Sequence, residues 1–74
     1  MNLEYIKKTI QAANHNIIET YNYFAHYRYE NINEYLDKSL KSAIKANEII
    51  MNIIENLKEI NKKVIERNKE EYHE

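Results

Sequence analysis

The sequence of 74 residues contains no cysteine, no glycine and no proline. The absence of cysteine excludes disulfides, thiolate metal ligands and thiol nucleophiles, and it suits a reducing cytosol. Glycine and proline form many of the tight turns and bulges of β-sheet proteins, so their absence argues against a sheet. Helices need neither residue. The composition therefore favours an all-α fold.

Long hydrophobic runs and an excess of one charge are also absent. No unbroken apolar run exceeds three residues, which is far too short to span a membrane. The first ten residues, MNLEYIKKTI, lack the basic-then-apolar order of a signal peptide, so we expect a cytoplasmic protein. The net charge is −1, from 11 basic and 12 acidic residues. Any binding to nucleic acid must therefore depend on a local patch rather than on the overall field.

Apolar residues recur at alternating steps of three and four in two segments, which is the spacing of amphipathic helices in coiled coils. The first series is Leu3, Ile6, Ile10, Ala13, Ile17, Thr20, Phe24 and Tyr27. The second series is Leu36, Leu40, Ala43, Asn47, Ile50, Ile54, Leu57, Asn61, Val64 and Asn68.

The two series fall out of step between residues 27 and 36, where the sequence reads ENIN at 30–33. Asn31 followed by Glu34 matches an Asx-led capping box, and Asn33 is an alternative N-cap. We therefore predict one domain, residues 1–74, folded as an antiparallel hairpin with helices at about 3–29 and about 33–70. The charged residues 66–74 are expected to be a solvated or frayed tail. The alternative is one long continuous coiled-coil helix, because asparagine is the only turn signal.

The predicted helices have a wider apolar stripe than one neighbouring helix can bury. We therefore expect two hairpins to dimerise into a four-helix bundle, whose helix direction, parallel or antiparallel, the sequence leaves open. Asn47 within this core is predicted to fix the register, as polar residues in coiled-coil seams do. The predicted oligomer core is Ile10, Ile17, Phe24, Leu36, Leu40, Asn47, Ile50, Ile54 and Leu57.

Motifs of catalysis and cofactor binding are missing. The sequence has no glycine-rich phosphate loop, no G-x-S-x-G, no H-E-x-x-H and no pair of E-x-x-H motifs. His15 with Glu19, and His26 with Glu30, have the i, i+4 spacing of a metal clamp, but the heptad frame turns them away from the core. We interpret this stripe as a solvated face and predict a protein that is not an enzyme and holds neither metal nor cofactor.

The segment YNYFAHYRY at 21–29 holds five aromatic rings in nine residues. The heptad frame assigns most of these rings to packing near the corner, with Phe24 in the seam. His26, Arg28 and Tyr29 remain exposed. Tyrosine and arginine are enriched at protein-binding hot spots, so these three residues are our predicted partner-binding site.

The leading functional prediction is a small helical protein-protein interaction, regulatory or adaptor protein that acts as a homo-oligomer. The alternative is a nucleic-acid-associated dimer, in which Lys38, Lys41 and Lys45 contact phosphates beside Arg28 and Tyr29. Acidic residues one turn before Lys38 and Lys41 argue against that alternative, because the spacing is that of helix-stabilising ion pairs. Neither helix has the basic flanks of a membrane-surface helix.

Overall fold

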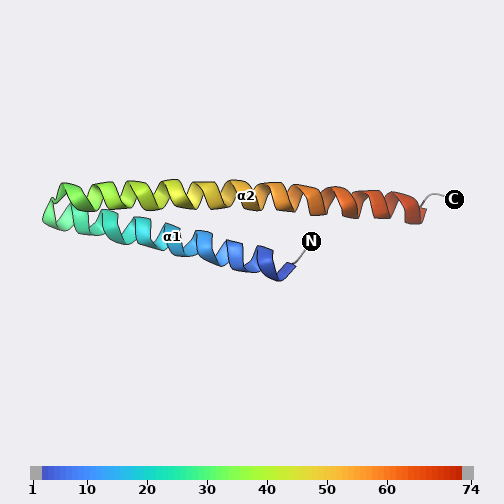
Figure 1. Cartoon of the computed structure of the whole chain (residues 1–74), viewed down its shortest axis with the longest axis horizontal. Coiled ribbons are helices and arrows are strands. Elements are labelled where there is room, and N and C mark those ends of the chain that lie inside the picture. Colours follow the sequence, from blue (N-terminus) through green and yellow to red (C-terminus); the bar gives the residue numbers. More distant parts are fainter. Residues whose placement is uncertain (1–2, 73–74) are drawn as a thin grey trace.

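The computed structural model describes residues 3–72, with the side chains of residues 3–69, and shows an antiparallel hairpin of two helices over that range (Figure 1). Helix α1 spans Leu3–Glu30 and helix α2 spans Asn33–Tyr72. The predicted all-α hairpin is confirmed, and the alternative of one continuous helix is wrong. Of the tail predicted at 66–74, α2 includes residues 66–72, with exposed side chains at 66–69, and residues 73–74 lie outside the described range.

The corner between the helices is made by Asn31 and Ile32. Asn31 has a φ of 56°, the left-handed conformation in which a helix often ends, and asparagine tolerates it better than most non-glycine residues. Its N–H donates to the carbonyl of Tyr27 at 2.7 Å, and the N–H of Tyr35 donates to the carbonyl of Ile32 at 3.0 Å. Asparagine thus performs at this corner the role for which most helical hairpins use glycine.

The contact between α1 and α2 is lined largely by small or polar side chains. The Ser39 hydroxyl donates to the carbonyl of Thr20 at 2.8 Å, which joins the two helices directly. The Asn16 side chain donates to the carbonyl of Ala12 at 2.9 Å, so its burial leaves no unpaired donor. Small residues allow two helix backbones to approach closely. The buried residues of the described range are Ile6, Ala13, Asn16, Ser39, Ala46 and Ile53.

This contact uses a different register of α2 from the predicted heptad series. The residues that face α1 are Ser39, Ala46 and Ile53, each one position before a member of the predicted series. On α1 the two registers share Ile6 and Ala13. The predicted series on α2 therefore lies beside the contact with α1 and faces outward.

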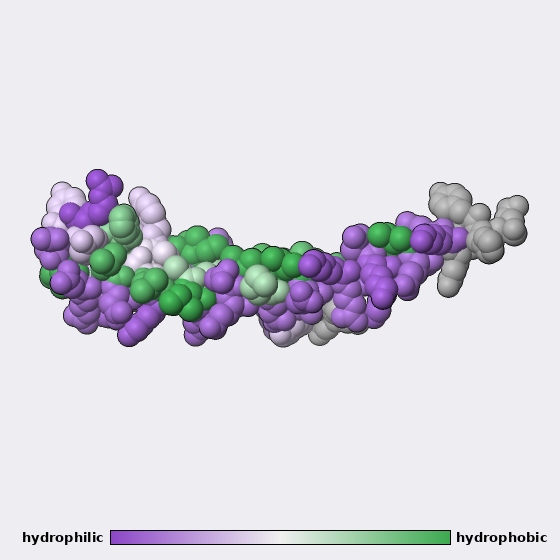
Figure 2. Space-filling view, turned by 90° about the horizontal axis from the view of Figure 1, so that it is seen from above, coloured by the Kyte–Doolittle hydropathy of each residue, from purple (hydrophilic) through white to green (hydrophobic). Residues whose placement is uncertain are grey.

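The two broad surfaces of the hairpin differ in chemistry. One surface carries rings and polar groups: Tyr23 stacks on Tyr35 at 6.5 Å between centroids, His26 stacks on Tyr35 at 5.3 Å, and the Asn52 amide donates to the Tyr5 hydroxyl at 3.3 Å. The other surface is apolar. In the view that looks onto α2, hydrophobic residues gather in a band along the hairpin (Figure 2).

Candidate functional site

The apolar surface, which we call the open face, contains the nine residues that the sequence predicts as an oligomer core. Rotation of 100° per residue places all of them on the same side of the α1–α2 contact. Ile50 is half-buried and Asn47 is exposed. The exposed fraction of the other seven side chains runs from 38% at Ile54 to 58% at Leu40. The residues of the open face are Ile10, Ile17, Phe24, Leu36, Leu40, Asn47, Ile50, Ile54 and Leu57.

The far half of the open face, away from the corner, holds a groove of about 430 Å³ between the two helices. Figure 1 shows α1 diverging from α2 as it runs from the corner toward the N-terminus. The groove follows the part where the helices separate. Its lining is Ile10, Gln11, Ala13, Asn14, Ile17, Ile50 and Ile53.

The corner half of the same face carries large side chains that project from the surface. Phe24 lies 6.2 Å from the ring of Tyr27 and is 43% exposed. Leu36 and Leu40 project beside it from the first turns of α2. The open face thus has a projecting end and a grooved end.

The total accessible area shows how little of the chain is covered by its own fold. The hairpin exposes 6330 Å², whereas a compact monomer of 9.0 kDa exposes about 4,900 Å². The excess is roughly 1,400 Å² on that scaling. It arises from the elongated shape, 66 Å long and 16 by 14 Å across. A stable protein interface covers about 800 Å² on each partner, so the excess is large enough to supply one.

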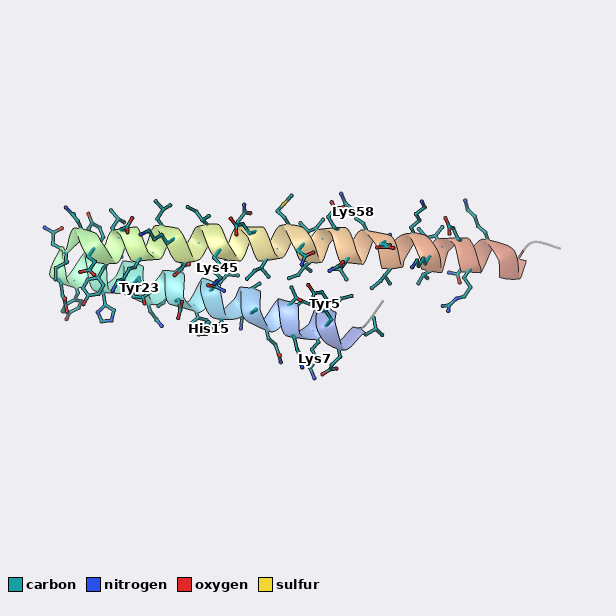
Figure 3. The ribbon with its side chains drawn as sticks, viewed as in Figure 1. Tyr5, Lys7, His15, Tyr23, Lys45 and Lys58 are labelled. Carbon is teal, nitrogen blue, oxygen red and sulfur yellow. The ribbon has the colours of Figure 1, made fainter. Side chains whose placement is uncertain are left out.

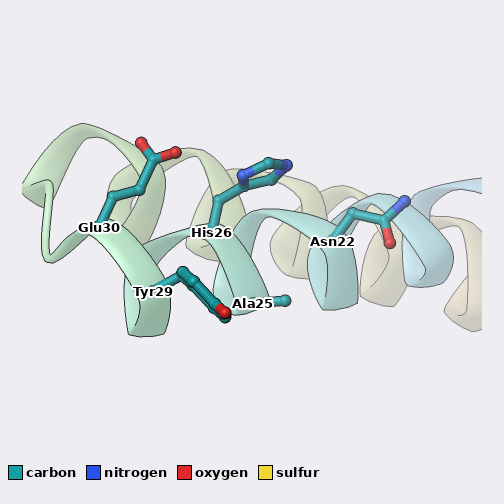
Figure 4. A pocket seen from close by; sticks show the side chains of 5 residues that line it. All are labelled: Asn22, Ala25, His26, Tyr29 and Glu30. Carbon is teal, nitrogen blue, oxygen red and sulfur yellow. The ribbon is translucent and has the colours of Figure 1, made fainter.

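The predicted partner site at the corner is only partly assembled. His26 and Tyr29 line a shallow hollow of about 320 Å³ on the outer side of α1, together with Asn22, Ala25 and Glu30 (Figure 4). Tyr29 is 94% exposed, and His26 is engaged on its other side by Tyr35. Arg28 is not among the residues of this hollow. It lies in the last turn of α1, where a cation compensates the helix dipole.

Two of the three lysines of the nucleic-acid alternative, Lys38 and Lys41, form ion pairs with acidic residues one turn earlier. Lys38 pairs with Glu34 at 3.4 Å, and its ammonium also lies 5.8 Å from the ring centroid of Tyr23. Lys41 pairs with Asp37 at 3.0 Å. These contacts bring negative charge to the face on which phosphates would bind, as the sequence spacing predicts.

The histidine stripe shows one of the two predicted pairs. The Nε2 atom of His15 lies 3.1 Å from a carboxylate oxygen of Glu19, and His15 points away from α2 (Figure 3). Within the described residues, no three His, Asp or Glu side chains are grouped so as to hold a metal ion. Neither described helix is long and apolar enough to cross a membrane.

No protein family model, curated protein or solved structure matches this chain. The functional argument therefore depends on the surface of the chain itself. Sequence reasoning identified the residues of the open face and placed Ala13 in the seam, but it left the groove residues Gln11, Asn14 and Ile53 out of the predicted core. The small residues at 39, 42 and 46 were the available signal, because their spacing marks a second seam on α2.

Proposed function

We propose that this chain is a small non-enzymatic protein-interaction module, of the regulatory or adaptor kind, that acts as a homo-oligomer through its open face. The observation that carries the proposal is a row of eight large apolar side chains along one surface, of which seven are exposed and Ile50 is half-buried. Fully burying a leucine or isoleucine contributes about 1.5–3 kcal/mol, so a half-exposed row of them is a strong drive for association. Contiguous apolar surface of this extent marks protein-binding sites in soluble proteins.

The chemistry of the open face favours another polypeptide over a small ligand. The groove is lined by isoleucines and alanine, with Gln11 and Asn14 as its polar side chains. Small-molecule pockets enclose their ligands and converge several polar groups on them, whereas this groove is open along its length. A second apolar helix surface fits such a shape better, because it can lie along the groove.

In the oligomer the corner hollow stays accessible, because it lies on the outer side of α1. Tyr29 is then the residue best placed to contact a further protein, with His26 beside it. Arg28 contributes from the neighbouring side of the same turn. The module would thus use one face for self-association and the corner for its partner.

Sedimentation equilibrium over a concentration series tests the proposal. We expect a dimer at low micromolar concentration, and we expect Ile17→Glu to dissociate it at least tenfold more readily, because a carboxylate would be buried at the centre of the interface. The matched control is Asn22→Glu on the outer side of α1, which should keep the wild-type mass. A wild-type chain that stays monomeric at every concentration would overturn the proposal.

A further inference from the structure

We propose that a second copy of this chain lies on the open face with its corner at the opposite end, so that the two hairpins form a four-helix bundle about a twofold axis at the level of Ala13 and Ala46. This inference rests on the proposed function, since it names the partner and the direction of self-association. The uncovered area supports a second copy as the occupant. The excess of roughly 1,400 Å² over a compact monomer exceeds the share of about 800 Å² that each partner contributes to a stable dimer.

The shape of the open face determines the direction. In a twofold interface, the same surface patch of each copy contacts the same patch of the other copy. The patch must therefore be complementary to itself. With corners at opposite ends, the projecting Phe24, Leu36 and Leu40 of each copy meet the grooved half of the other. With corners at the same end, projecting side chains would meet projecting side chains and both grooves would stay empty. Empty apolar volume is costly in a packed interface.

The spacing on α1 agrees with this arrangement. Ile10, Ile17 and Phe24 are seven residues apart on the open face. An axis beside Ala13 lies close to the midpoint of Ile10 and Ile17, so it sets Ile17 against the partner's Ile10. It sets Phe24 against the partner's Leu3, one further step of seven residues along α1. The two isoleucines that meet both line the groove.

The spacing on α2 independently agrees with the same axis. The Ser39–Thr20 hydrogen bond sets Thr20 level with Ser39, and Ala13 and Ala46, each seven residues further from the corner, are buried in the same contact. The axis beside Ala13 therefore passes α2 close to Ala46, between Ala43 and Asn47. There it pairs Leu40 with the partner's Ile50, which is a projecting residue with a groove residue.

The other pairs made by this axis are also compatible. Leu36 meets the partner's Ile54, and Ala43 meets the partner's Asn47. Each pair joins the two alternating core positions of an antiparallel coiled coil. The small alanine leaves room for the asparagine side chain, so Asn47 is accommodated in the middle of the interface. One position of the twofold axis therefore gives compatible residue pairs on both α1 and α2.

Cysteine cross-linking tests the arrangement cleanly, because the chain has no cysteine of its own. An oxidised mixture of Ile10→Cys and Ile17→Cys should give a covalent heterodimer on a non-reducing gel, because these two positions meet across the interface. In Ile50→Cys the two thiols are ten residues apart along α2, about 15 Å at 1.5 Å per residue, which is too far for a disulfide. Ile50→Cys alone should therefore remain uncrosslinked. An oxidised mixture of Leu40→Cys and Ile50→Cys should give the covalent heterodimer.

The outcomes separate this inference from the proposed function. The reduced variants are first sedimented, so that only folded, dimeric protein is oxidised. A dimer in which neither the Ile10→Cys and Ile17→Cys mixture nor the Leu40→Cys and Ile50→Cys mixture cross-links would overturn the opposite-end arrangement and leave self-association intact. A wild-type chain that sediments as a monomer would instead overturn the proposed function itself.

Discussion

At the scale of single residues, the contact between α1 and α2 depends on side chains that are small. Ala13 and Ala46 are 4% and 3% exposed, although each side chain is one methyl group. The Ser39 hydroxyl reaches the Thr20 carbonyl at 2.8 Å in the same contact. A side chain larger by several methylenes at these positions would force the helices apart.

Ala46→Leu tests this close approach. We expect the free energy of unfolding to fall by about 1–3 kcal/mol, because the added carbons overpack a site that the second helix already fills. Ala12→Leu is the matched control, since the side chain of Ala12 is exposed. Chemical denaturation at one protein concentration measures both, because the stability of an oligomer depends on concentration. Equal stability of Ala46→Leu and Ala12→Leu would show that the helices are not in close contact at residue 46.

The residues of the corner between α1 and α2 also differ in their roles. Asn31 adopts the left-handed conformation without glycine, and the Tyr35 ring holds the first turn of α2 against Tyr23 and His26. Tyr29, six residues earlier, is almost fully exposed. Two tyrosines of one corner thus have opposite roles, one in packing and one on the surface.

At the scale of the helices, replacing each of these two tyrosines by alanine shows which side chain stabilises the fold by packing and which is only exposed on the surface. We expect Tyr35→Ala to lower the free energy of unfolding by about 1–3 kcal/mol, because it removes two ring contacts and the cation–π contact of Lys38. We expect Tyr29→Ala to change it by less than about 0.5 kcal/mol. Thermal melts followed by circular dichroism measure both. If Tyr29→Ala destabilised the fold as much as Tyr35→Ala, Tyr29 would be a packing residue and not a surface for a partner.

The helices themselves could be predicted from the sequence to within two residues, because their signals are local. Apolar residues spaced alternately three and four positions apart indicate α1 and α2, and the interruption of this spacing near Asn31 indicates the corner. The register of the α1–α2 contact could not be predicted in the same way. Apolar residues cover a wide arc of α2, and a rule that places the most apolar series in the seam selects Leu40, Asn47 and Ile54. The structure places Ser39, Ala46 and Ile53 there instead.

The reason for the difference is that two kinds of contact compete for the same helix. Close approach of two helices favours small side chains, whereas burial of the largest apolar area favours leucine and isoleucine. In a single hairpin, small residues line the contact between α1 and α2. They allow the helices to approach closely, but the large apolar residues stay uncovered. The residues of the candidate site could therefore be predicted from the sequence. Their exposure could not, because the sequence does not show which residues of α2 are covered by α1.

At the scale of the whole molecule, the open face joins eight large apolar residues into one surface, with Asn47 near its middle. Asn47 is exposed in the hairpin and lies close to the twofold axis that we propose. A polar residue at such a position weakens association but disfavours arrangements in which it meets a large apolar residue.

Asn47→Leu tests this role. We expect the variant dimer to melt at a higher temperature, because an apolar side chain replaces a desolvated amide. We also expect a less defined arrangement, so that cross-linking of the Leu40→Cys and Ile50→Cys mixture falls in the Asn47→Leu background and cross-linking through Ile50→Cys alone becomes detectable. Asn22→Leu, on the outer side of α1, controls for the general effect of an added leucine. If the Asn47→Leu dimer kept the wild-type melting temperature and cross-linking pattern, Asn47 would have no part in specifying the arrangement, and the shape of the two ends of the open face would determine it alone.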